Sequence, residues 1–169
     1  MTKTILIPTD FTVKSLNLAK IALQKNLSSQ GKVRLILVHG FWMSTSISDL
    51  LFYSKKSLLD KLETADFRAS CKLLLGKYED KIDQMTIDLF SGRNQSSFEN
   101  YLEAHNIDEV YISPSYKYKL KNSSSFDLNP FIAKSKVKQV EVNWELSANH
   151  EDTQDELSAL FFTHGQIAH

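Results

Sequence analysis

The sequence has few of the features that mark extracellular, membrane or nucleic-acid-binding proteins. Its single cysteine, Cys71, cannot form an internal disulfide, which fits a reducing cytoplasm. The longest apolar run is only a handful of residues, far shorter than a membrane-spanning helix requires. Lysine and arginine total 20, as do aspartate and glutamate, so the excess of positive charge that nucleic-acid binding requires is lacking. We therefore expect a cytoplasmic protein that binds neither membranes nor nucleic acids.

Familiar catalytic and metal-binding motifs are missing too. The chain contains no G-x-S-x-G, no G-x-x-x-x-G-K-[ST] and no H-E-x-x-H sequence. Its five histidines are scattered, without the spacing of a zinc site. A phosphoacceptor receiver domain would need an aspartate at the end of the third strand, where this chain has Ser91 and Gly92. We expect no metal site, no catalytic residues and therefore no enzymatic activity.

The chain does contain a regular alternation of strand-like and helix-like segments. Short runs rich in apolar residues predict strands at 4–9, 33–39, 85–90, 110–113 and 137–142. The spacing of apolar residues predicts helices at 16–27, 58–78 and 128–134, and another that starts with a capping box of Ser96 and Glu99. This order predicts an α/β three-layer sandwich, in which a five-stranded parallel sheet of order 3-2-1-4-5 has helices on both faces.

A change in composition near residue 147 suggests how the chain is divided. We expect residues 1–146 to form the domain and residues 147–169 to form a polar linker and a final helix. Thr153 and Glu156 form a capping box at the start of that helix, and apolar residues follow on one face. The helix is predicted to dock on the domain or to swap onto a partner.

The carboxyl ends of the first and fourth strands are the expected ligand site, because ligands of open α/β sheets bind where the strand order reverses. Asp10 follows the first strand, where it could accept hydrogen bonds from a ribose or a base, or cap the first helix. Capping is the favoured role for an aspartate at such a turn. His39 ends the second strand and is expected to be a buried, hydrogen-bonded side chain. No nucleophile–base pair can be assigned to this crevice.

Three segments of the chain together resemble universal stress protein domains. They are Ile5-Leu-Ile-Pro-Thr-Asp-Phe-Thr12, Leu35-Ile-Leu-Val-His39 and Ile107-Asp-Glu-Val-Tyr-Ile112, and the likeness extends over residues 4–142. The resemblance implies the fold predicted above and a ligand site at the same crevice. The candidate cofactor-binding residues are Pro8, Thr9, Asp10, His39, Ser113 and Ser115.

The phosphate-binding part of that family's pattern is absent. Nucleotide-binding members carry G-x2-G-x9-G-[S/T] after the fourth strand, and the equivalent positions here hold Ser113, Tyr116, Phe126 and Asp127. Glycines let backbone N–H groups approach a phosphate closely, whereas aromatic side chains occupy that space. The carboxylate of Asp127 would also repel an anion. We therefore expect the nucleotide site to be lost or altered and no cofactor to be bound.

The resemblance implies a non-catalytic stress-response or regulatory domain. Members of the family commonly pair through their last strand, so a homodimer is expected through Val140, Val142 and Trp144. The protein partner is not defined by the sequence. The alternative is an ATP- or AMP-binding switch, or a weak ATPase, that uses the glycine-free loop. In that case Thr9, Asp10 and His39 would contact the base, and Ser115 and the lysines of the loop would contact the phosphates.

Overall fold

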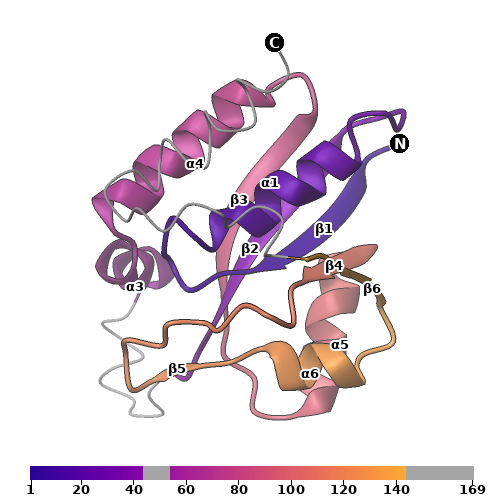
Figure 1. Ribbon diagram of the computed structural model, residues 1–169. Coiled ribbons are helices and arrows are strands. Elements are labelled where there is room, and N and C mark those ends of the chain that lie inside the picture. Colours follow the sequence, from indigo (N-terminus) through magenta and orange to yellow (C-terminus); the bar gives the residue numbers. More distant parts are fainter. Residues whose placement is uncertain (44–53, 144–169) are drawn as a thin grey trace.

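The computed structural model describes residues 1–43 and 54–143, which form one mixed sheet with helices on both faces (Figure 1). Five strands run parallel in the order β3-β2-β1-β4-β6. Their bounds are β1 (Lys3–Pro8), β2 (Val33–Phe41), β3 (Ile82–Phe90), β4 (Glu109–Ile112) and β6 (Lys138–Glu141). The predicted α/β fold and strand order are confirmed.

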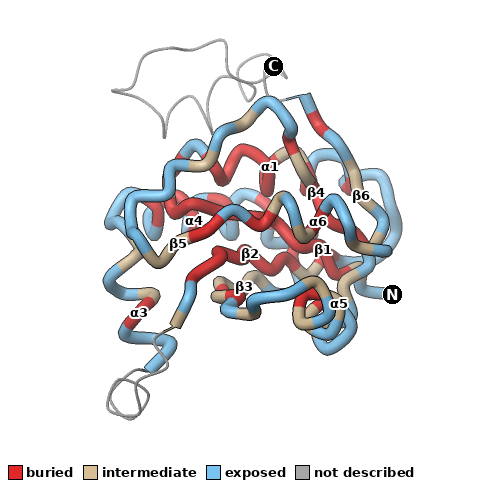
Figure 2. Tube along the Cα trace, turned by 90° about the horizontal axis from the view of Figure 1, so that it is seen from below, coloured by how far each residue is buried: buried red, intermediate tan, exposed pale blue. Residues whose placement is uncertain are grey.

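The helices bury both faces of the sheet, which explains why the central strands are apolar at successive positions. On one face lie α1 (Leu16–Lys25), α3 (Lys55–Leu62) and α4 (Ala65–Lys77), and on the other α5 (Gln95–Ala104) and α6 (Asn129–Lys134). Ile5 and Ile7 belong to the same buried core as Phe67 of α4, whereas Leu6 between them belongs to the core that contains Phe98 of α5. Figure 2 shows the buried strands β1 and β2 lying between these layers.

Two predicted helix boundaries are wrong because polar side chains start helices at other residues. The segment predicted as one helix over 58–78 is two helices, α3 and α4, separated by extended backbone at Glu63 and Thr64. The Thr64 hydroxyl accepts a hydrogen bond from the Phe67 N–H and so caps α4. Similarly, α5 is capped by Asn94, whose side chain accepts from the Ser97 N–H, and not by Ser96.

One strand was not predicted. The two-residue β5 (Ser125–Phe126) pairs antiparallel with the end of β2, so that Gly40 lies opposite Phe126. Gly40 is required there because a Cβ at this position would lie 2.5 Å from the Phe126 carbonyl oxygen. This pairing brings the loop after β4 across the carboxyl end of the sheet.

The predicted final helix, with its capping box of Thr153 and Glu156, lies outside the described residues, as does the division at residue 147. Within residues 1–43 and 54–143, no helix is both long and apolar enough to span a membrane.

Candidate functional site

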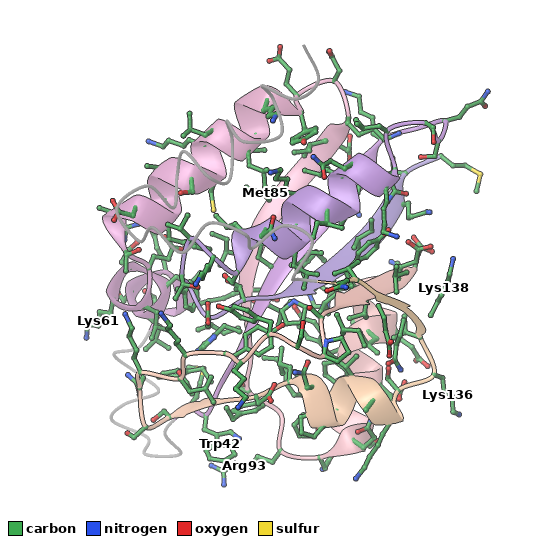
Figure 3. All side chains as sticks on the ribbon, viewed as in Figure 1. Trp42, Lys61, Met85, Arg93, Lys136 and Lys138 are labelled. Carbon is green, nitrogen blue, oxygen red and sulfur yellow. The ribbon has the colours of Figure 1, made fainter. Side chains whose placement is uncertain are left out.

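A cleft of about 490 Å³ opens at the carboxyl end of β1 and β2. It is bordered by the loop between β1 and α1, by the junction of α3 and α4, and by residues 119–125. Three lysines line it: Lys61, which projects from α3 (Figure 3), and Lys119 and Lys121 from the loop after β4. Its volume is within the range of small-molecule sites, and its lysines would favour an anionic ligand.

Asp10 lies at this cleft, but its carboxylate is occupied by the protein itself. Oδ1 accepts hydrogen bonds from the N–H of Thr12 at 3.1 Å and from its hydroxyl at 2.5 Å. Oδ2 accepts from the Tyr116 hydroxyl at 2.7 Å and from the Lys119 N–H at 2.8 Å. The expected capping of α1 is therefore wrong, because α1 begins only at Leu16. Asp10 joins the loop after β1 to the loop after β4.

Thr9 and Phe11 shape the turn that presents Asp10. The Thr9 hydroxyl contacts the Ser15 hydroxyl at 2.8 Å and accepts from the Phe11 N–H at 3.1 Å. Phe11 has a φ of 61°, in the left-handed region that non-glycine residues rarely adopt. Its ring packs against His39 and Phe67, with centroid distances of 4.8 and 5.4 Å. Packing and hydrogen bonding thus hold a strained backbone at the edge of the cleft.

His39 is buried and hydrogen-bonded through both ring nitrogens, as expected. Nδ1 lies 2.8 Å from the Thr9 carbonyl oxygen, and Nε2 lies 2.7 Å from the Ser125 hydroxyl. Because a carbonyl oxygen only accepts, Nδ1 must carry the proton and Nε2 accepts from Ser125. Burial lowers the pKa of His39, so the ring is neutral at pH 7. Ser125, which the sequence did not place at this crevice, reaches His39 because β5 pairs with the end of β2.

Two of the positions that the sequence aligns with phosphate-binding glycines, Tyr116 and Phe126, hold packed side chains. Phe126 is 9% exposed and stacks on Trp42, with a centroid distance of 5.0 Å, at the end of β2 (Figure 3). Tyr116 reaches back to Asp10 and also lies 3.1 Å from the Thr12 hydroxyl. Between Pro8 and this segment, a cavity of only about 10 Å³ remains, enough for one water molecule.

The structure places only some of the other predicted cofactor-binding residues at a cavity. Pro8 and Thr9 line the small cavity, and His39 borders both it and the larger cleft. Ser113 is buried at the end of β4, and its hydroxyl lies 3.4 Å from that of Ser115. Neither serine lines the cleft or the small cavity. Sequence spacing could not show this, because their position depends on the path of the whole 113–128 loop.

A second polar cluster surrounds Asp88, a buried residue of β3. Its carboxylate accepts a 2.6 Å hydrogen bond from the Tyr101 hydroxyl and pairs with Lys55. Burial by itself would raise the pKa of Asp88, but Lys55, Tyr101 and the Leu89 N–H together outweigh it and hold the pKa below its ordinary value. A groove of about 430 Å³ lies beside it.

Metal binding is not indicated by the geometry of the described residues. Among them, no group of three or more histidine, cysteine, aspartate or glutamate side chains is placed to hold a metal ion. Cys71 is buried, and burial raises the pKa of its thiol to about 12, so it is an unreactive packing residue.

Comparison with known proteins identifies the fold. No protein-family model and no curated protein sequence matches the chain. Among solved structures, universal stress protein UspA from Lactobacillus plantarum aligns with a TM-score of 0.54 at 13% identity, covering 83% of this chain and 97% of that one. The hypothetical protein MJ0577 aligns with a TM-score of 0.50 at 19% identity, covering 83% and 95%. A family protein from Arabidopsis thaliana with AMP bound aligns at 8% identity over 83% and 91% of the chains, but its TM-score of 0.47 is too low to support an inference.

These similarities define the class of protein: the chain has the universal stress protein fold. The resemblance seen in the sequence is therefore confirmed at the level of the fold. Identities below 20% leave the function to be argued from the site itself.

Proposed function

We propose that this protein is a cytoplasmic, universal stress protein-like regulatory domain that does not turn over nucleotides and whose nucleotide site is altered. The observation that carries the proposal is the packing of residues 116–126 across the carboxyl end of the sheet. Asp10 accepts hydrogen bonds from Tyr116 and Lys119, and Phe126, which the sequence aligns with a phosphate-binding glycine, pairs with Gly40 of β2. A triphosphate in that position would have to displace both aromatic side chains, and the carboxylate of Asp127 would repel it.

The alternative, an ATP- or AMP-binding switch, is favoured by one observation. The cleft of about 490 Å³ beside the closed segment carries three lysines and is large enough for a nucleotide. Such a ligand would bind with its phosphates near Lys119 and Lys121, outside the position that the glycine motif would define.

Calorimetry with ATP, ADP, AMP and cyclic AMP distinguishes the two functions. We expect no binding at ligand concentrations up to about 1 mM. Binding at millimolar or lower concentration that is abolished in Lys119→Ala and Lys121→Ala, but kept in the control Lys72→Ala on the exposed face of α4, would establish the switch instead.

Homodimer formation through the last strand remains part of the proposal. β6 is an edge of the described sheet, and Lys138 projects from it (Figure 3). Val140 and Val142 pack into the protein's own core, so pairing would use the backbone edge of β6. Trp144 lies outside the described residues. Sedimentation velocity over a dilution series tests this: we expect twice the monomer mass of 19.3 kDa, and a monomer at micromolar concentration would exclude the dimer.

A further inference from the structure

The cleft contains a hydroxyl group and a base in the geometry of an activated nucleophile. Ser125 Oγ lies 2.7 Å from His39 Nε2, and both residues line the cleft. The Thr9 carbonyl, 2.8 Å from Nδ1, fixes the tautomer in which Nε2 carries the lone pair. A nucleophile, a base and a group that orients the base are the three elements by which such sites are recognised.

The surroundings of the pair favour its reactivity toward an anionic substrate. His39 is buried, and burial lowers its pKa, so Nε2 is free to take the Ser125 proton at pH 7. Lys61, Lys119 and Lys121 line the same cleft, whereas the carboxylate of Asp10 already accepts four hydrogen bonds. The remaining acidic group at the cleft, Asp66, is exposed. The cleft is therefore suited to a small molecule that carries a carboxylate.

We propose that Ser125 is a nucleophile that accepts an acyl group from small activated esters carrying a carboxylate. Its Oγ attacks the ester carbonyl carbon, and the bond from that carbon to the leaving oxygen breaks. The Ser125 proton passes to His39 Nε2 and from there to the leaving oxygen. The products are an acyl ester on Ser125 and a free alcohol, and no oxidant or metal takes part. This reaction goes beyond the proposed regulatory role, because it acylates Ser125 once per chain and involves no nucleotide.

The experiment uses the full chain at pH 7 with two six-carbon esters, 4-nitrophenyl hemiadipate and its uncharged counterpart 4-nitrophenyl hexanoate. We expect about one equivalent of nitrophenolate to be released and a stable adduct to form on the peptide that contains Ser125. One favourable charge interaction of about 1.4 kcal/mol corresponds to a tenfold rate, so the hemiadipate should react about tenfold faster. Peptide mass spectrometry locates the adduct.

Variants separate a reactive pair from a merely structural hydrogen bond. Ser125→Ala should remove the adduct, and His39→Gln, whose amide can still hydrogen-bond to Ser125, should slow acylation at least a hundredfold. The neighbouring Ser123→Ala should react like the wild-type protein. An adduct on a lysine, an unlabelled wild-type protein, or His39→Gln that reacts at the wild-type rate would overturn the proposal. The wild-type protein alone decides the first two outcomes, even if a variant fails to fold.

Discussion

Replacing Asp10 with asparagine tests whether this residue holds the two loops together. The substitution keeps the shape of the side chain but turns one carboxylate oxygen into an NH2 group, which cannot accept hydrogen bonds. Each oxygen of Asp10 accepts from two donors, and an NH2 group at the Oδ2 position faces the Tyr116 hydroxyl and the Lys119 N–H. The Tyr116 hydroxyl can turn toward Thr12, 3.1 Å away, but the Lys119 N–H has no such freedom.

The expected loss of stability follows from these contacts. Hydrogen bonds to a charged group contribute about 1.5–3 kcal/mol each. Asp10 is only 7% exposed, so water replaces these bonds poorly. We expect the free energy of unfolding of Asp10→Asn to fall by about 3 kcal/mol. In a chain of this length, that corresponds to a melting temperature lower by about 9 °C.

Urea unfolding and amide hydrogen exchange measure the two parts of this prediction. Exchange at the Lys119 amide should accelerate strongly in Asp10→Asn, because its acceptor is lost. The matched control is Asp66→Asn, which makes the same charge change at an exposed position of the same cleft and should alter stability by less than about 1 kcal/mol. If Asp10→Asn were as stable as the control, Asp10 would not join the loops.

Three further changes test the packing and the electrostatics. Lys20 is 1% exposed, and burial lowers its pKa to about 8, so Lys20→Met should raise the free energy of unfolding by about 2 kcal/mol at pH 7. That gain should shrink between pH 8 and 10.5; an equal gain at both pH values would contradict it. Gly40→Ala should cost about 2 kcal/mol, because its Cβ would meet the Phe126 carbonyl, whereas Gly76→Ala, with open space around it, should not destabilise. Since the pKa of His39 is lowered, its contribution to stability should be complete above pH 6.5 and decline as the pH falls below it, and His39→Gln should remove that decline in urea titrations.

The candidate site was only partly predictable because its contacts join residues far apart in the chain. Asp10 and His39 could be placed at the crevice, since each lies near the carboxyl end of a strand whose apolar pattern is plain. Ser125 could not, because nothing in the polar run around it shows that two of its residues pair with β2. The Asp10 contact to Lys119 likewise spans 109 residues and has no local pattern.

The sequence alone determined the order of the five parallel strands and that helices connect them, because runs of apolar residues with a period of two or 3.6 record which faces are buried. It also determined that the loop after β4 lacks the glycines of a phosphate cradle. Only the tertiary structure decided what that loop does instead: it closes onto Asp10 and delivers Ser125 to His39. The path of such a loop depends on which distant polar groups form hydrogen bonds with its backbone and side chains. These partners come close to the loop only when the sheet has formed.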